Sequence, residues 1–294
     1  MYYVKCQSET EAKLGFHRQE VSAIIAAAEA QSCIDNNGIK NTVIERGELA
    51  KTNCRDLILE VGRRCNLKCE HCLRGEAQNV TMSFETAKTA IDQFDSIGTI
   101  TFTGGEPALY GKEISDIVDY IIATDVPVGS FYVATNGVHL DWALMNALMR
   151  LYAHCDVKEM CSLDISNDHF HQSDMSYSSL NYDIYKAFSF TQLRGDIAEV
   201  LLINEGRAYE NGYGGRYLSY DSAFYYDEWD NEIQQKEMDV EMVYINALGG
   251  VLPDCDFSYQ SQDEMNPYTI VDITSGKITM QKIIKTYNKE ENDG

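Results

Sequence analysis

The order of apolar segments predicts an α/β fold built on a parallel sheet. From residue 56 onward, short β-rich runs alternate with amphipathic, helix-like stretches, which is typical of βα units. A chain of 294 residues is long enough for one large α/β domain with short additions at its ends. No repeat or low-complexity segment interrupts the alternation. We therefore expect one main sheet with helical connections.

The central elements follow one another in a regular order. The strand candidates are residues 57–61, 99–103, 131–134, 160–163, 199–203 and 242–245. Amphipathic apolar spacing predicts helices at residues 84–94, 114–123, 142–152 and 182–190. Six strands of this kind predict six βα units.

The N-terminal region lacks this alternation. Residues 8–34 include an alanine-rich run at 21–30 that favours a helix by propensity, and a polar, glycine-containing stretch at 35–38 would end it. This pattern predicts an N-terminal helical extension. We divide the chain into that extension (1–54), a core (55–240), and a last strand with a C-terminal extension (241–294).

The C-terminal residues predict a different local structure. Residues 243–255 contain a strand candidate, a Gly-Gly turn and a second strand candidate, which predict a short β-hairpin. An apolar-alternating segment follows at 270–273, and a helix is expected at about 280–287. The charged last residues are expected to fray.

Composition argues against nucleic-acid and membrane partners. The chain has 24 Lys and Arg residues against 46 Asp and Glu residues, a formal net charge of −22, and no long basic stretch. This average field would repel a phosphate backbone, which argues against a tRNA or DNA substrate. No apolar run reaches the roughly 18 residues of a membrane span, and the first residues do not resemble a signal peptide. We therefore expect a cytoplasmic protein.

Cys65, Cys69 and Cys72 are the candidate metal ligands. Three thiolates spaced by three and then two residues can wrap one loop around three corners of a cubane iron–sulfur cluster, leaving the fourth iron without a protein ligand. An open metal position is where a substrate or cofactor binds. The nine cysteines of the chain are an odd number, which fits a reducing compartment, and the loop would be sensitive to oxygen.

A zinc knuckle is the alternative reading of these cysteines. His71 or Cys54 could complete it. A closed zinc site usually draws on paired Cys-x2-Cys elements, however, and the chain has no second pair.

The cysteine triplet and a later Gly104-Gly105-Glu106-Pro107 segment resemble the radical S-adenosylmethionine (radical SAM) superfamily over roughly residues 55–210. The resemblance implies a partial (βα)6 TIM-like barrel with one [4Fe–4S] cluster. It implies that the open iron chelates S-adenosylmethionine (SAM) and that an electron cleaves SAM to methionine and a 5′-deoxyadenosyl radical, which abstracts hydrogen from a substrate. The protein would supply ligation, orientation and exclusion of competing reactions.

The same resemblance assigns SAM contacts near the loop. Gly104, Gly105, Glu106 and Pro107 would receive the methionyl amino group, and the missing Cβ atoms of the glycines allow close backbone approach. His71 stands where the family usually has an aromatic residue that packs near the adenine.

Further candidates lie at or near later strand ends. Thr135 and Asn136 end the third strand, and they would line SAM or simply form a turn. Ser162 and Asp164 share one face of the next strand, where the family often places polar residues against the ribose or carboxylate of SAM. The run 167–171 lies just beyond Asp164, and it would either reach substrate or form a solvated loop.

Two candidates lie in the C-terminal half. Asn204 and Arg207 follow the fifth strand candidate, where Arg207 would hold a carboxylate of SAM or substrate, or would form a surface salt bridge. Cys255 would return a hydrogen atom to a substrate radical, as an epimerase requires, or would be a buried small apolar residue.

The substrate class has two readings. A peptide or peptide-like substrate follows from loose likeness to peptide-modifying members, whereas a small metabolite or nucleotide follows from the lack of a cysteine-rich C-terminal region. A reducing partner such as flavodoxin or ferredoxin is expected in either case. A cluster-containing sensor without turnover is the alternative from another class.

Overall fold

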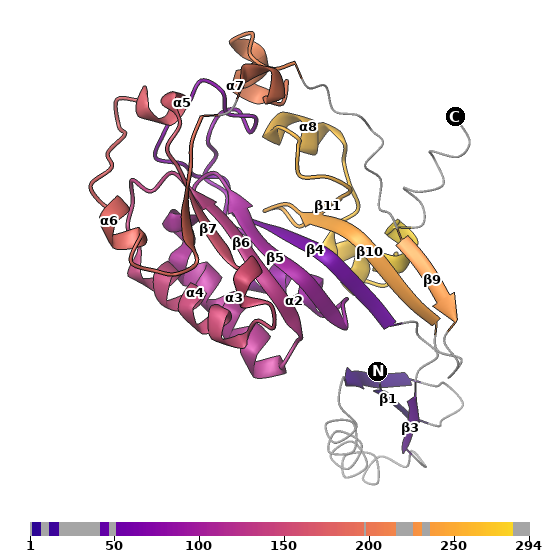
Figure 1. Cartoon of the computed structure of the whole chain (residues 1–294). Helices are drawn as coiled ribbons and strands as arrows, with labels where there is room; N and C mark the ends of the chain where they lie inside the picture. The colour runs from indigo at the N-terminus through magenta and orange to yellow at the C-terminus, as the bar shows by residue number, and fades with distance from the viewer. Residues whose placement is uncertain are drawn as a thin grey trace. The chain divides into compact units, whose positions relative to one another are not determined.

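The computed structural model describes residues 2–6, 12–17, 42–46, 51–196, 198–215, 226–230 and 236–284 (Figure 1). The chain divides into two compact units, which are considered separately. The smaller unit comprises residues 1–52 and 227–238, and the larger comprises residues 53–226 and 239–294.

The described part of the smaller unit consists of strands. β1 (Tyr2–Cys6) pairs antiparallel with both β2 (Ala12–His17) and β3 (Thr42–Arg46), and β9 (Tyr226–Asp230) also falls mostly in this unit. The helix predicted over residues 8–34 is therefore wrong at Ala12–His17. Pairing with β1 overrides the weak helical propensity there. Gly15 disfavours a helix, and Phe16 is enriched in strands. The alanine-rich run at 21–30 lies outside the described residues.

The larger unit is built on one sheet. Its strands are β4 (Lys51–Gly62), β5 (Ser96–Gly104), β6 (Val128–Thr135), β7 (Ser162–Ser166), β8 (Thr191–Arg194), β10 (Lys236–Ile245) and β11 (Val251–Leu252). They lie in the order β11-β10-β4-β5-β6-β7-β8, and β4 to β8 are parallel neighbours. The predicted α/β class with a mostly parallel sheet is confirmed.

Two strand predictions need correction. Residues 199–203 are not a strand: Glu199–Leu201 is a single 3-10 turn, and β8 at Thr191–Arg194 is the fifth parallel strand instead. The strand predicted at 160–163 begins later, at Ser162, because Lys158–Met160 forms another 3-10 turn. In both places short apolar runs had indicated strands, and such runs do not distinguish a strand from a turn or helix.

The last parallel strand, β10, lies on the side of β4 away from β5, next to the edge strand β11. Asn53 Nδ2 donates to Asp239 Oδ1 at 2.7 Å, and Arg55 bonds to Glu241, so residue numbers rise together along β4 and β10. β10 therefore runs parallel to β4 and lies beside it, which brings the C-terminal segment next to the first strand of the core.

The three long helices occur where they were predicted. They are α2 (Phe84–Ile91), α3 (Gly111–Thr124) and α4 (Trp142–His154). Ser83 and Asp141 cap α2 and α4 by accepting bonds from backbone N–H groups in the first turn. The helix predicted at 182–190 is only one turn, α6 (Tyr182–Tyr185).

The sheet has one apolar and one polar face. Right-handed crossovers between strands in sequential order place α2, α3 and α4 on the same face (Figure 1). Neighbouring apolar side chains are fully buried on one face, including Leu59, Phe102 and Val133 in one row. The opposite face carries polar residues such as Ser130 and Asp164. This polar face is the natural floor of a site.

The C-terminal part contains the predicted hairpin and three short helical segments. β11 pairs antiparallel with the end of β10, as predicted. α8 (Tyr259–Glu264) follows, and the apolar segment 270–273 lies in α9 (Ile270–Thr274), where Thr269 and Asp272 form a capping box. Residues 280–284 are helical, and the rest of the predicted last helix lies outside the described residues. Among the helices that the structure describes, none is long and apolar enough to cross a membrane.

Candidate functional site

The three candidate ligands lie on one loop that follows β4. Cys72 N donates to Cys69 O at 3.2 Å, and Leu67 N approaches Cys65 Sγ at 3.5 Å, so the loop turns tightly around its thiols. All three cysteines are free. Cys69 is buried, whereas Cys65 and Cys72 are half-buried. We call residues 63–82 the cysteine loop.

The environment of these thiols is unfavourable for bare thiolates. Burial raises the pKa of Cys65 to about 11 and that of Cys69 to about 12, and the proximity of the thiols to one another adds to both shifts. A metal that binds thiolates reverses this balance, because its own charge dominates such a site. The loop is therefore suited to a metal centre and poorly suited to a free nucleophile.

His71, within the cysteine loop, lies among aromatic rings. Its ring stacks on Phe170 with centroids 4.5 Å apart and meets His171 edge-on at 5.0 Å. Burial lowers the pKa of His71 to about 4. Its Nδ1 is buried and has no hydrogen-bond partner among the described residues, while ligand atoms of Cys69, His71 and His171 all lie within 4.8 Å of one another.

The Gly104-Gly105 turn clamps the start of the cysteine loop. Gly105 N donates to Gly62 O at 3.0 Å, and Glu106 N donates to Arg64 O at 2.8 Å. A Cβ at Gly104, whose φ is +145°, would lie 2.0 Å from Gly62 O, and one at Gly105 would lie 2.2 Å from Arg64 O. Both glycines are therefore required by backbone packing against the loop.

Glu106 points inward and joins β5 to β6. Its carboxylate accepts bonds from Ala108 N at 2.9 Å, Thr135 Oγ1 at 2.6 Å and Asn136 N at 2.8 Å. Burial raises the pKa of Glu106, although these bonds act in the opposite direction. Pro107 begins the 3-10 turn η1 (Pro107–Tyr110) that Glu106 caps. The Glu106 side chain thus organises the strand ends.

Asn136 connects Glu106 to the cysteine loop. Its Nδ2 donates to Asn66 Oδ1 at 2.8 Å, next to Cys65, and its Oδ1 accepts from Val138 N at 3.0 Å. Thr135 and Asn136 are buried and lie beside the cysteine loop. The predicted turn is present as well.

Ser162 and Asp164 lie together on the polar face, as the strand pattern predicted. Ser162 Oγ bonds to Asp164 Oδ1, and Tyr132 OH donates to Asp164 Oδ2 at 3.2 Å. Gln192 Nε2 donates to Ser162 Oγ at 2.7 Å. These side chains form a polar row across β6, β7 and β8.

Arg207 binds the loop backbone. In α7 (Gly206–Glu210), Arg207 N donates to Cys72 O at 2.9 Å, Arg207 Nε donates to Cys69 O at 2.9 Å, and Nη1 forms an ion pair with Glu76 at 3.3 Å. The Arg207 side chain is 10% exposed and its ion-pair partner Glu76 is exposed, so the salt bridge forms at the edge of the loop while the rest of the guanidinium is buried. Asn204 is half-buried just before this helix.

Cys255 follows the hairpin on the C-terminal side. It packs against Ile58, Tyr244 and Leu252, and its Sγ lies 3.5 Å from Asp256 Oδ1. The side chain is half-buried, and burial raises the pKa of its thiol to about 12. The structure thus places a protonated thiol next to β4.

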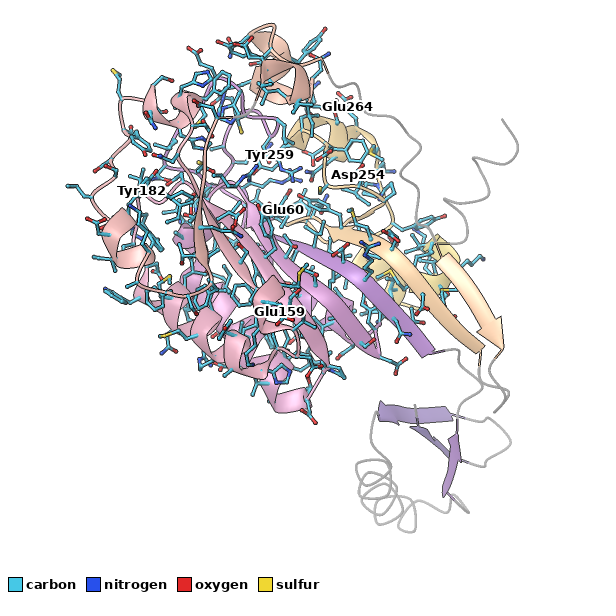
Figure 2. The ribbon with its side chains drawn as sticks, viewed as in Figure 1. Glu60, Glu159, Tyr182, Asp254, Tyr259 and Glu264 are labelled. Atoms are coloured by element: carbon cyan, nitrogen blue, oxygen red, sulfur yellow. The ribbon has the colours of Figure 1, made fainter. Side chains whose placement is uncertain are left out.

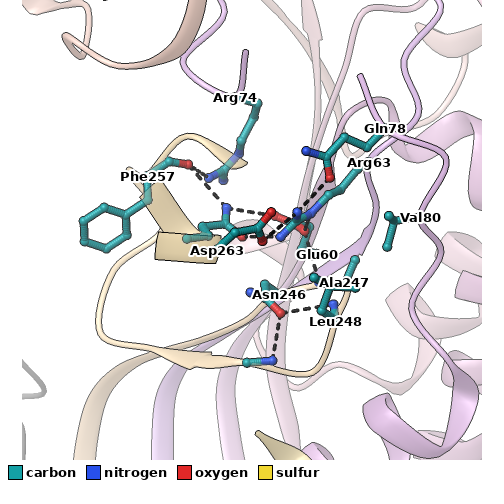
Figure 3. A network of polar contacts seen from close by, with 12 residues as sticks. Glu60, Arg63, Arg74, Gln78, Val80, Asn246, Ala247, Leu248, Phe257 and Asp263 are labelled. Atoms are coloured by element: carbon teal, nitrogen blue, oxygen red, sulfur yellow. Dashed lines mark hydrogen bonds and ion pairs between the residues drawn. The ribbon is translucent and has the colours of Figure 1, made fainter. Parts of the chain in front are cut away.

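The sequence did not predict a buried polar network that joins the end of β4 to the C-terminal segment (Figure 3). Arg63 has no exposed surface, and it donates to Glu60 at 2.7 Å, to Gln78 at 2.9 Å and to Gln262 at 2.9 Å. Glu60 also accepts bonds from Tyr244 OH and from Ala247 N at 3.0 Å. The only signal in the sequence was the charge of Glu60, inside an apolar strand, and of Arg63, just after it.

The run 167–171 contains a second feature that the sequence left open. Asp168 caps α5 (His169–Gln172) and bonds to His171 Nδ1 at 2.8 Å. Burial alone would raise the pKa of Asp168, but the bonds to His171 outweigh it and lower this pKa to about 2. His171 therefore faces Cys69 and His71 with its ring fixed by a carboxylate.

Comparisons with known proteins agree with this geometry. The radical SAM superfamily profile matches residues 59–179. An uncharacterised protein of Methanocaldococcus jannaschii is 48% identical over 69 residues, which are 22% of this chain and 24% of that protein. An AdoMet-dependent heme synthase of Nitratidesulfovibrio vulgaris is 40% identical over 78 residues, which are 24% of this chain and 20% of the synthase. The chain thus matches about a quarter or less of the length of these relatives.

One solved structure aligns over most of its length with this chain. BtrN in complex with AdoMet and 2-DOIA aligns with a TM-score of 0.47 and 17% identity, covering 80% of this chain and 85% of BtrN. Residues 59–179 of the chain carry a radical SAM superfamily domain. This domain supports an enzyme, and the reaction on its substrate is unassigned.

The residues present fit the cofactors of this family, a [4Fe–4S] cluster and SAM. Three free thiols on one tight loop supply three cluster ligands, which leaves one iron for another molecule. Of the three buried polar side-chain atoms without a partner among the described residues, two are His71 Nδ1 and Tyr259 OH: His71 belongs to the cysteine loop, and Tyr259 packs against it. Such unpartnered groups are expected where a bound group is part of the site.

Proposed function

We propose that Cys65, Cys69 and Cys72 hold one [4Fe–4S] cluster and that the protein cleaves SAM reductively to abstract hydrogen from a peptide-like substrate. The observation that carries this proposal is the fixed cysteine loop. Backbone N–H groups of Glu106 and Arg207 bond to the loop from two sides, and Gly105 bonds to Gly62 just before it, while all three thiols remain free. When bound, the cluster would supply the electron that breaks SAM into methionine and a 5′-deoxyadenosyl radical.

The chain's own residues would position SAM rather than react with it. The Gly104-Gly105 turn lies against the loop and would present backbone groups to the methionyl amino end. The polar row containing Ser162 and Asp164 would orient the ribose or carboxylate, and the His71 side would face the adenine. The bonds of Glu106 to Thr135 and Asn136 support a positioning role for Glu106.

The proposal is tested by anaerobic reconstitution with iron and sulfide. The protein is reduced with dithionite and given SAM, and 5′-deoxyadenosine is quantified. We expect release by the native sequence, loss of release in Cys69→Ala, and near-native release in Cys161→Ala, which removes a buried cysteine outside the loop. A cluster that assembles but never cleaves SAM would contradict the enzyme proposal and favour a sensor.

A peptide-like substrate is supported by the resemblance and by the sheet edge. β8 is the terminal strand of the sheet beside the polar face, and its residues 192–194 are exposed. An edge strand can pair with an extended peptide backbone. Deuterated peptides that label 5′-deoxyadenosine would identify such a substrate.

A small-molecule substrate is the second candidate. The partial match to a heme synthase favours it, and so does the presence of only one cysteine, Cys255, after residue 161. Deuterium transfer from small metabolites, with none from peptides, would select this alternative.

Two further roles remain proposals. A flavodoxin or ferredoxin would deliver electrons in place of dithionite. Cys255 would donate a hydrogen atom to a substrate radical, because its thiol is protonated and half-buried beside β4. A Cys255→Ala variant that still forms epimerised product at the normal rate would contradict this role.

A further inference from the structure

Tyr259 is a buried side chain with an unused donor. It is 2% exposed, and its hydroxyl has no hydrogen-bond partner among the described residues. A buried hydroxyl without a partner loses its hydrogen bonds to water and gains none in return, so its retention calls for an explanation. Figure 2 labels Tyr259 at the start of α8 in the larger unit.

Two contacts hold Tyr259 against the cysteine loop. Its backbone N–H donates to Arg74 O at 3.1 Å, two residues after Cys72. The guanidinium of Arg63 lies 4.6 Å from the centre of its ring. Arg63 is itself fixed by Glu60 and Gln262, so the ring has little freedom.

Glu60 and Gln262, the polar side chains that bond to Arg63 near Tyr259, already have hydrogen-bond partners. The two Glu60 oxygens accept from Arg63, Ala247, Tyr244 and Gln262. The Gln262 side-chain oxygen accepts from Arg63 at 2.9 Å. The electrostatic neighbours of the Tyr259 hydroxyl also include Cys72. Among these neighbours, Cys72 is the one that belongs to the candidate metal site.

We propose that Tyr259 donates a hydrogen bond to a sulfur atom of the cluster site beside Cys72 and thereby makes the cluster easier to reduce. This inference rests on the proposed function. A hydrogen bond to a cluster sulfur stabilises the extra electron of the reduced state, so it raises the reduction potential. Tyr259 is then a positioning residue supplied by the C-terminal segment, outside the cysteine motif.

The test is an anaerobic redox titration of the reconstituted protein, followed by electron paramagnetic resonance (EPR). Tyr259→Phe removes the donor and keeps the ring, so we expect a more negative midpoint potential at unchanged iron content. Tyr185→Phe is the matched control, because it removes a buried hydroxyl that bonds to His139 O away from the loop. We expect the control to keep the native potential.

A second variant keeps the test decisive if Tyr259→Phe does not load iron. 3-Fluorotyrosine introduced at position 259 keeps the hydroxyl and makes it a stronger donor, so the midpoint potential should become less negative. Iron-loaded variants with the native potential would overturn the inference while leaving the proposed function intact. Failure of the native protein to assemble a cluster would overturn both.

Discussion

The cysteine loop is supported from two sides that differ in kind. On the β5 side, the support is backbone: two glycines lie against Gly62 and Arg64, and Glu106 ties the turn to β6. On the C-terminal side, the support is a network of buried charged and polar side chains centred on Arg63, contributed by segments about 200 residues apart.

The difference shows two ways of holding the same loop. Close backbone contact depends on missing Cβ atoms, so it is local, compact and visible as a motif. The Arg63 network depends on matching a buried charge with Glu60, Gln78 and Gln262, so it exists only after distant segments meet. We expect substitutions in the Gly-Gly turn to destabilise the loop by steric overlap. We expect substitutions in the Arg63 network to destabilise it by leaving a buried charge unpaired.

The largest effect is expected from Arg63→Met. Removing one partner of a buried ion pair leaves Glu60 without its counter-charge, which typically costs about 3–5 kcal/mol in free energy of unfolding. Urea unfolding of the reconstituted protein measures it. Arg150→Met breaks the partly exposed pair with Asp119 and should cost below about 1 kcal/mol. Equal losses in free energy of unfolding in the two variants would contradict a supporting role for the Arg63 network.

Gly105→Ala should have the next largest effect. Its Cβ would lie 2.2 Å from Arg64 O, so the turn and the cysteine loop must separate, at a cost of about 1–3 kcal/mol. We also expect reduced iron content after reconstitution. Gly195→Ala is the control, because nothing lies within 4 Å of the added atom. Native stability and iron content in Gly105→Ala would show that the turn does not clamp the loop.

Asp168→Asn is a reference for the two preceding variants, because it changes the site but alters neither the Gly-Gly turn nor the Arg63 network. The pKa of Asp168 is lowered to about 2, so its ionised form stabilises the fold above about pH 4, and this contribution is lost as the pH falls toward 2. We expect a loss of about 2 kcal/mol at pH 6 that shrinks at pH 3, measured by urea unfolding at each pH. Asparagine keeps the helix cap, and iron content should stay native. A penalty that grows on acidification would contradict the assignment.

The predictable parts of this molecule were those set by local pattern. Alternating strands and helices indicated the parallel sheet, and Cys65, Cys69, Cys72 and the Gly-Gly turn indicated the site. Arg207 was a candidate ligand for a carboxylate or a surface salt bridge, and its bond to the carbonyl of Cys69 could not be predicted, because it depends on how α7 docks on the loop. The place of β10 beside β4 and the burial of Arg63 follow from contacts between distant segments, which periodicity does not encode.

The central claim is that three thiols hold a cluster with one open iron. The most direct measurement is metal and sulfide analysis of the anaerobically reconstituted protein, with EPR spectra of the reduced state before and after SAM is added. We predict about four iron and four sulfide per chain and a spectrum that changes when SAM binds the open iron. Stoichiometric zinc with no cluster signal, or a spectrum that SAM leaves unchanged, would contradict the account.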